Sequence, residues 1–361
     1  MDLKNFKTYL YIFGMLAVAL TIFPFVAVDY WWIRIFDFPH IQLTILTFVA
    51  LVVFFMRFDL KRLNDYLFVT VMAVCLIIQV WKIIPYTPLA DKDINDSQEK
   101  KSGTSISLYA ANVLQSNKKP ELLISDFKKM DPDIMLLVET NKRRRDYIIE
   151  NLPETYKYKV EVPQDNTYGM LLYSKYKLIN PQVKFLVDKD IPSIHTKLLL
   201  TSNDTVQLYS IHPTPPMPQH NSRSTDRDSE MMKIANLSRT STYPVIVLGD
   251  FNDVAWSNTT SLFQNVGELL DIRKGRGIYN TYNAKSFLMR WPLDHIFVSA
   301  EFRLIAIKLG QDINSDHLPT YAKLSFEPLK AAEQQPEKPS ERQLKNAKEQ
   351  AERVQLEISK Y

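Results

Sequence analysis

Three long apolar stretches lie in the first 86 residues, and they limit the architecture more strongly than any other part of the sequence. They cover about residues 9–28, 38–56 and 67–84, and the first contains no charged residue over twenty positions. A helix of that length measures roughly 30 Å, which matches the hydrocarbon core of a bilayer. We therefore predict a membrane anchor over residues 1–86 with three transmembrane helices.

The alternative for the first stretch is a cleaved signal peptide. No small-x-small cleavage site follows it, because residues 26–28 lead into Asp29 and a run of aromatic residues. Basic residues gather before the first stretch, at Lys4 and Lys7, and again between the second and third. The positive-inside rule then places the N-terminus in the cytoplasm and everything after the third span outside it. We predict a multi-pass cell-membrane protein in this orientation, and the reversed topology is the alternative.

The rest of the chain divides by composition. Residues 87–103 are rich in Pro, Asp, Lys, Ser and Gly, which predicts a linker. Residues 104–328 alternate short β-rich apolar runs with helix-like stretches, which predicts an α/β domain. Residues 329–361 are polar with apolar positions three and four apart, so we predict a polar helical or disordered tail. The single cysteine, Cys75, excludes a disulfide scaffold and a cysteine-based zinc site.

The most specific polar motif follows the apolar run 245–248. That run ends abruptly in the sequence GDFN, at residues 249–252. Side chains two residues apart in an extended chain point to the same side, so Asp250 and Asn252 are expected to face one space. The end of a buried strand holds such groups rigidly beside an open loop, which suits a functional site. The alternative is a strand followed by an Asx-type turn.

Other apolar runs are also bordered by polar residues of catalytic type. A lone acid, Glu139, ends one of them, and its charge is expected to have a bound cation as its partner. Asp316 and His317 are adjacent before the last run, where they offer a carboxylate and an imidazole to one small volume. Three further runs begin or end at Asn112, His212 and Asp294.

In this order the motifs resemble the endonuclease/exonuclease/phosphatase superfamily, which includes DNase I, abasic-site endonucleases, bacterial sphingomyelinases and inositol-polyphosphate phosphatases. The resemblance covers about residues 104–326 and rests on GDFN at 249–252 combined with SDH at 315–317. It implies an α/β fold, a DNase I-like four-layer sandwich of two mixed sheets flanked by helices, here preceded by three transmembrane helices. One departure is Leu114, because the nuclease branches often carry an acid there; this weakens the case for an abasic-site repair enzyme.

The resemblance also implies a role for each matching residue. Glu139 is expected to be the main Mg²⁺ ligand, with Asn112 and Asp316 completing the metal environment. Asp250 is expected to orient or deprotonate the attacking water, and Asn252 to hold a phosphate oxygen. The three remaining residues concern the phosphate and its leaving group: His317 on the scissile phosphate, Asp294 hydrogen-bonded to His317, and His212 as a second imidazole.

The leading hypothesis is a membrane-anchored, Mg²⁺-dependent phosphodiesterase or phosphatase with an extracytoplasmic catalytic domain. Mn²⁺ is the alternative metal, and the substrate is a phosphate ester such as a nucleic acid or a nucleotide. One alternative is hydrolysis of a phospholipid headgroup, as in sphingomyelinases. Another is a non-catalytic membrane module that kept the fold for binding. The N-terminal helices make the lipid bilayer a second partner, and the oligomeric state is not predicted.

Overall fold

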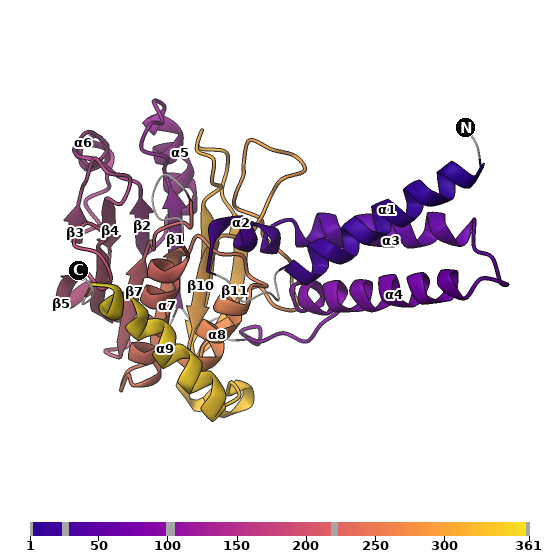
Figure 1. Cartoon of the computed structure of the whole chain (residues 1–361). Coiled ribbons are helices and arrows are strands. Elements are labelled where there is room, and N and C mark those ends of the chain that lie inside the picture. Colours follow the sequence, from indigo (N-terminus) through magenta and orange to yellow (C-terminus); the bar gives the residue numbers. More distant parts are fainter. Residues whose placement is uncertain (1–2, 24–28, 99–104, 218–222, 359–361) are drawn as a thin grey trace.

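A bundle of three helices projects from one side of an α/β domain (Figure 1). The computed structural model describes residues 3–23, 29–98, 105–217 and 223–358. The bundle helices are α1 (Leu3–Ile22), α3 (His40–Phe55) and α4 (Leu63–Ile83), and the 3-10 turn η3 (Ile84–Tyr86) follows α4. The described N-terminal end and the α3–α4 loop lie at the end of the bundle that is remote from the domain (Figure 1).

The predicted membrane spans are supported in part. Among the described residues, one helix, Leu63–Tyr86, is long and apolar enough to cross a bilayer. A second qualifies only if the bent pair Trp31–Asp37 and His40–Phe55, which meet at 67°, is one span. The apolar part of α1, Phe6–Ile22, is shorter than this length. Residues 24–28 of the first predicted span lie outside the described residues, so the three-helix anchor stays a prediction.

Polar side chains link all three bundle helices near the domain, and α1 to α4 at the remote end. The Gln79 amide donates hydrogen bonds to Thr21 and Thr47, at 2.5 and 3.0 Å, which connects α4 to α1 and α3. At the remote end, the buried Asp65 carboxylate accepts hydrogen bonds from Lys7 and Tyr11. These contacts satisfy buried polar groups and set how the helices are rotated against one another.

Two six-stranded mixed sheets form the centre of the domain. The strand orders are β11-β12-β1-β2-β4-β3 and β5-β6-β7-β8-β10-β9. β1 and β2 pair in parallel, as do β7 and β8, and the other pairs are antiparallel. The strands of the first sheet are β1 (Ser105–Asn112), β2 (Ile134–Val138), β3 (Tyr158–Val162), β4 (Met170–Ser174), β11 (Phe302–Leu309) and β12 (Thr320–Phe326). Those of the second are β5 (Lys177–Lys184), β6 (Ser193–Leu199), β7 (Thr205–Ile211), β8 (Val245–Asp250), β9 (Leu270–Asp271) and β10 (Asp294–Val298).

The sheets pack face to face, and helices cover their outer faces. Strand β1 shows why: Ile106 and Leu108 join the core between the sheets, whereas Tyr109 and Ala111 pack under the helices. The first sheet is covered by α5 (Pro120–Met130) and α6 (Lys142–Asn151). The second is covered by α7 (Thr225–Arg239), α8 (Asn258–Gly267) and α9 (Glu341–Ile358). The predicted sandwich of two mixed sheets flanked by helices is confirmed.

The segment predicted as a linker, residues 87–103, packs on the domain where it is described. Ile94 is fully buried in the core between the sheets. Asp96 forms a β-bridge with Leu304, and the backbone N–H of Asn95 donates to the Gln334 side chain at 2.7 Å. This packing could not be predicted from composition, because Ile94 alone scarcely changes the average hydrophobicity of a polar segment.

The predicted tail, residues 329–361, also packs on the domain. The 3-10 helix η4 (Pro328–Gln334) and α9 occupy most of it. Ala347 and Val354 of α9 are buried, and the Ser229 hydroxyl of α7 donates to the Ala351 carbonyl at 2.9 Å. The apolar stripe that the sequence shows is therefore a packing face against α7 and α8 rather than a solvated helix surface.

Candidate active site

All eight predicted site residues lie at one edge of the two sheets, where the central strands end. Asn112 and Asp250 are the last residues of β1 and β8, and Asp294 is the first of β10. Glu139 and His212 directly follow β2 and β7. The others stand in adjoining loops, namely Asn252 after β8 and Asp316 and His317 before β12.

Strand register explains why these positions converge. Asn112 is paired with Val138, the residue before Glu139. Asp250 is paired directly with Asp294 across the antiparallel β8–β10 ladder. Asn112 and Glu139 therefore lie side by side at the edge of one sheet, and Asp250 and Asp294 at the edge of the other. The packing of the two sheets brings these two pairs together.

Close strand spacing at Gly249 helps to hold this arrangement. Its φ of 149° is a conformation that favours glycine, and a Cβ there would lie 1.9 Å from the Ile211 carbonyl oxygen. Ile211 and Gly249 are register partners in the parallel β7–β8 pair, and each precedes a site residue. The glycine thus allows His212 and Asp250 to approach, with 3.8 Å between His212 Nε2 and Asp250 Oδ2.

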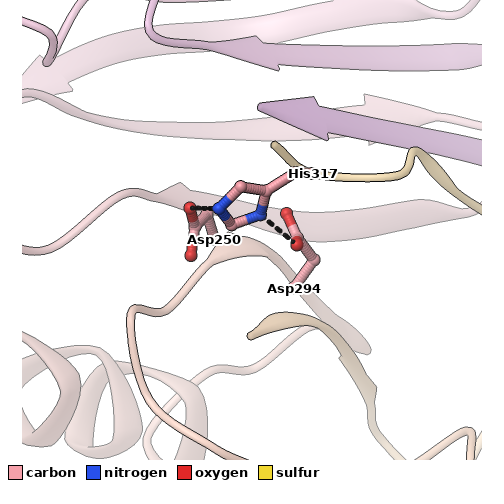
Figure 2. A group of neighbouring side chains, drawn as sticks. All are labelled: Asp250, Asp294 and His317. Carbon is pink, nitrogen blue, oxygen red and sulfur yellow. Dashed lines mark hydrogen bonds and ion pairs between the residues drawn. The ribbon is translucent and has the colours of Figure 1, made fainter. Parts of the chain in front are cut away.

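His317 lies between two buried carboxylates, as Figure 2 shows. Its Nδ1 is 2.8 Å from Asp294 Oδ2, and its Nε2 is 3.5 Å from Asp250 Oδ2. The Ser315 hydroxyl fixes the same loop: it accepts from the His317 backbone N–H at 3.1 Å and donates to the Asn112 carbonyl at 2.7 Å. Both ring nitrogens therefore face an anionic oxygen.

The electrostatics favour a protonated imidazole. Burial disfavours the charged ring, but Asp250 and Asp294 outweigh burial and raise the pKa of His317 to about 10. Burial also acts against the Asp250 carboxylate, yet His317 and His212 hold its pKa below the usual range. Burial dominates at Asp294 and raises its pKa. In this arrangement His317 is the cation and Asp250 the anion of the site.

Asn112 positions two carboxylates on opposite sheets. Its Nδ2 donates to Glu139 Oε1 at 2.8 Å and to Asp250 Oδ2 at 3.1 Å, while its Oδ1 accepts from the Leu114 backbone N–H at 3.0 Å. Asn112 therefore presents its N–H₂ group, not its oxygen, to the site. Glu139 has a left-handed φ of 57°, a sparsely populated conformation for a non-glycine residue that the surrounding structure must stabilise.

Asn252 and His212 are joined through the loop after β7. Asn252 Nδ2 donates to the Pro213 carbonyl at 2.9 Å, and its backbone N–H donates to Asp250 Oδ1 at 3.0 Å. Asn252 also has a left-handed φ, 50°. His212 is buried, and its Nδ1 has no hydrogen-bond partner among the described residues. The His212 residue also borders the cavity that Glu139 borders.

The acidic residues fit a divalent cation best at Glu139. Ligand atoms of Asp250, Asp294 and His317 lie within 4.8 Å of one another, but the imidazole lies between those two carboxylates and its nitrogens face them. Within the described part of the chain, neither Glu139 nor Asp316 forms an ion pair, and both border one cavity. Oxygen ligands of this kind are those that Mg²⁺ prefers. Glu139 and Asp316 are therefore the residues most suited to hold the metal.

Several residues of the site had no recognisable signal in the sequence. Tyr282 packs against His317 with its ring tilted by 47° and 4.9 Å between ring centroids, and the ring centroids of Tyr168 and His212 are 5.7 Å apart. The Thr281 hydroxyl accepts from the backbone N–H of Asp294 at 3.2 Å. Arg227 Nη1 donates to the Asn252 carbonyl at 2.9 Å.

Fold and site together define a DNase I-like α/β sandwich with an acid–imidazole cluster at its strand ends. The sequence matches the model of the Endonuclease/Exonuclease/phosphatase family over residues 108–317, so the chain belongs to that family. Enzymes of this family generally use divalent metals, and membership supports phosphoric ester hydrolysis as the chemistry.

Comparison with solved structures supports the fold. The chain resembles a humanized D. rerio TDP2 with 14 mutations, with a TM-score of 0.51 and 16% identity over 62% of this chain and 99% of that chain. D. rerio TDP2 complexed with single strand DNA product gives the same four values. At this identity the likeness concerns the fold alone. No curated protein sequence matches the chain.

Proposed function

We propose that the protein is a membrane-anchored, divalent-metal-dependent phosphoric ester hydrolase with an extracytoplasmic catalytic domain. The observation that carries the proposal is the buried His317 between Asp250 and Asp294, with the Glu139 carboxylate joined to Asp250 through the Asn112 amide. Hydrolysis of a phosphate ester needs a positive group beside the phosphate oxygens and a base for the attacking water. This cluster offers both.

Each residue has a chemical task in this proposal. Glu139 and Asp316 would hold a Mg²⁺ or Mn²⁺ ion, which supplies charge neutralisation on the phosphate. Protonated His317 donates a hydrogen bond to a phosphate oxygen, and Asp294 fixes the ring through Nδ1. Asp250 accepts the proton of the water as the oxygen–phosphorus bond forms and the bond to the leaving oxygen breaks. The second imidazole, His212, is placed to stabilise the leaving oxygen.

The bundle supports membrane anchoring through its outward-facing side chains. Ile12, Phe48 and Ile77, one from each long helix, are more than half exposed in the isolated chain. An apolar surface of this kind is stable against lipid and would favour aggregation in water. The three-helix anchor over residues 1–86 accounts for all three helices at once.

The position of the basic residues supports the orientation. Lys7 lies near the start of α1, and Arg57 and Arg62 lie between α3 and α4. Figure 1 shows the start of α1 and the α3–α4 loop at the end of the bundle that is remote from the domain. The positive-inside rule places that end in the cytoplasm and the domain outside. A reporter fused after the last residue, or protease treatment of intact cells, tests this: protection of the domain until lysis would reverse the topology.

The chemistry is tested on the full-length protein in nanodiscs with bis(p-nitrophenyl) phosphate and p-nitrophenyl phosphate. We expect hydrolysis with Mg²⁺ or Mn²⁺ that EDTA abolishes and that His317→Ala and Glu139→Gln each lower at least 100-fold. Glu150→Gln, an exposed acid on α6, is the matched control and should behave as wild type. A folded protein that binds metal but hydrolyses neither ester would favour a non-catalytic binding module.

A further inference from the structure

A cavity of about 770 Å³ adjoins the site, and the membrane-proximal segment forms part of its wall. Polar residues of the site, including Glu139, His212 and Asp316, border it on the domain side. The short helix α2 (Trp31–Arg34), the 3-10 helix η2 (Ile35–Asp37) and the two residues after η2 border it as well. Segments almost 300 residues apart in sequence thus enclose one space.

The wall from α2 and η2 is fixed to the domain by buried polar contacts. Arg34 Nη2 lies 3.2 Å from Asp228 Oδ2 and donates to Thr259 Oγ1 at 2.7 Å. The Trp256 indole N–H donates to the Asp37 carbonyl at 2.7 Å. Because Arg34 and Asp37 are both bonded to the domain, the segment that contains η2 forms a fixed wall of the cavity.

The chemistry of this surface is apolar. Trp31, Ile35, Phe36 and Phe38 contribute from α2 and its neighbourhood, and Met289 contributes from the loop before β10. No Lys or Arg lines the cavity within the described ranges. A cavity for a nucleic acid would be expected to carry basic residues for several phosphates, whereas this one offers a single polar region and an extended hydrocarbon-like surface.

The cavity also lies beside the start of the anchor helix α3, because Pro39 is one of its lining residues. The Gln42 amide of α3 donates to the Leu288 carbonyl at 2.6 Å, which places the loop before β10 at the domain-proximal end of α3. Phe287 and Leu288 in that loop are 91% and 71% exposed. Exposed aromatic and aliphatic side chains beside the start of a membrane helix are suited to the interface between headgroups and acyl chains.

We propose that the substrate is a phosphate ester of a membrane lipid. Its phosphate occupies the polar region at Glu139 and His212. Its hydrocarbon part lies along Trp31, Ile35 and Met289. This inference rests on the proposed hydrolase function and adds the substrate class. The segment between the first two anchor helices is then a specificity-determining part of the catalytic pocket as well as a connection.

The test uses p-nitrophenyl phosphodiesters whose second group is ethyl, butyl, octyl or dodecyl, with the full-length protein in nanodiscs and Mg²⁺ or Mn²⁺. Such a series varies the hydrocarbon part without requiring the natural headgroup. Each buried methylene favours binding, so we expect kcat/KM to rise at least tenfold from ethyl to octyl. The octyl-to-ethyl ratio should fall at least threefold in Ile35→Ser and in Met289→Ser, and at least tenfold in the double variant.

A matched control distinguishes binding of the alkyl chain in the cavity from partition of long-chain esters into the bilayer. Ile305 on β11 is 42% exposed, comparable to Ile35 at 49%, and does not border the cavity. Ile305→Ser should keep the wild-type octyl-to-ethyl ratio, although partition of the esters into the bilayer affects this variant and the cavity variants equally. An unchanged ratio in the double variant would overturn the lipid assignment, as would a higher kcat/KM for single-stranded DNA than for the octyl ester. If no ester of the series is hydrolysed at all, the hydrolase function itself fails.

Discussion

Replacing Gly249 by alanine should disturb the site without removing any catalytic group. The added Cβ would lie 1.9 Å from the Ile211 carbonyl oxygen, where real Cβ contacts are essentially never below 3.0 Å. Strands β7 and β8 must therefore separate locally by at least about 1 Å. Because His212 and Asp250 directly follow Ile211 and Gly249, their 3.8 Å separation increases as well.

The size of the effect follows from two contributions. A non-glycine residue in this backbone region costs about 1–3 kcal/mol, and the strand displacement adds packing strain, so the free energy of unfolding should fall by about 2–4 kcal/mol. A misplacement of about 1 Å in a catalytic arrangement lowers the rate roughly 100-fold. The loss should appear in kcat, since the cavity walls away from β8 are unchanged.

The assay combines thermal unfolding in detergent with steady-state hydrolysis of bis(p-nitrophenyl) phosphate. Gly277→Ala is the matched control, because its nearest contact would be a side-chain atom of Tyr279 at 3.2 Å and not the backbone. Gly277→Ala should keep stability and rate close to wild type. Normal kcat in Gly249→Ala, at temperatures where the variant is folded, would refute the claim that the β7–β8 spacing positions the site.

Three further outcomes are expected. Asp294→Asn should lower kcat about 100-fold with little change in KM, because Asp294 fixes His317 but does not border the cavity; a change confined to KM in steady-state kinetics would contradict this. Glu139→Gln should weaken Mn²⁺ binding, followed by the paramagnetic resonance of the free ion, at least tenfold; unchanged affinity would place the metal elsewhere. Burial raises the pKa of Glu230 to about 8, so this carboxyl stays protonated in the folded protein while the unfolded chain ionises above pH 4.5. Stability should therefore fall as pH rises from about 4.5 to 8, and Glu230→Gln should remove this slope and raise the midpoint temperature at pH 8; an unchanged slope in thermal scans would refute the assignment.

The central strands of the fold could be predicted from sequence because both of their faces are buried. The apolar runs at 134–138 and 245–248 coincide with β2 and with most of β8. Strands such as β3 and β5 were not predicted, because they are only partly buried and lack an unbroken apolar run.

The candidate site was predictable where its residues end buried strands. Asp250 and Glu139 belong to that group, and the structure brings them to a common hydrogen-bond partner, Asn112. Residues that reach the site from loops, such as Tyr282, have no local pattern that marks them. The apolar wall from α2 could not be predicted for another reason. Its aromatic residues follow a predicted membrane span, where such residues are expected at the interface. The sequence alone therefore does not show that they also line the cavity.

The packing of α9 has a consequence for how the protein is made. The face of α7 and α8 that receives Ala347 stays uncovered until α9 has been synthesised. This layer therefore folds after the anchor and both sheets have been produced. A chain cut before residue 341 would keep every site residue and leave one hydrophobic layer of the domain open to solvent.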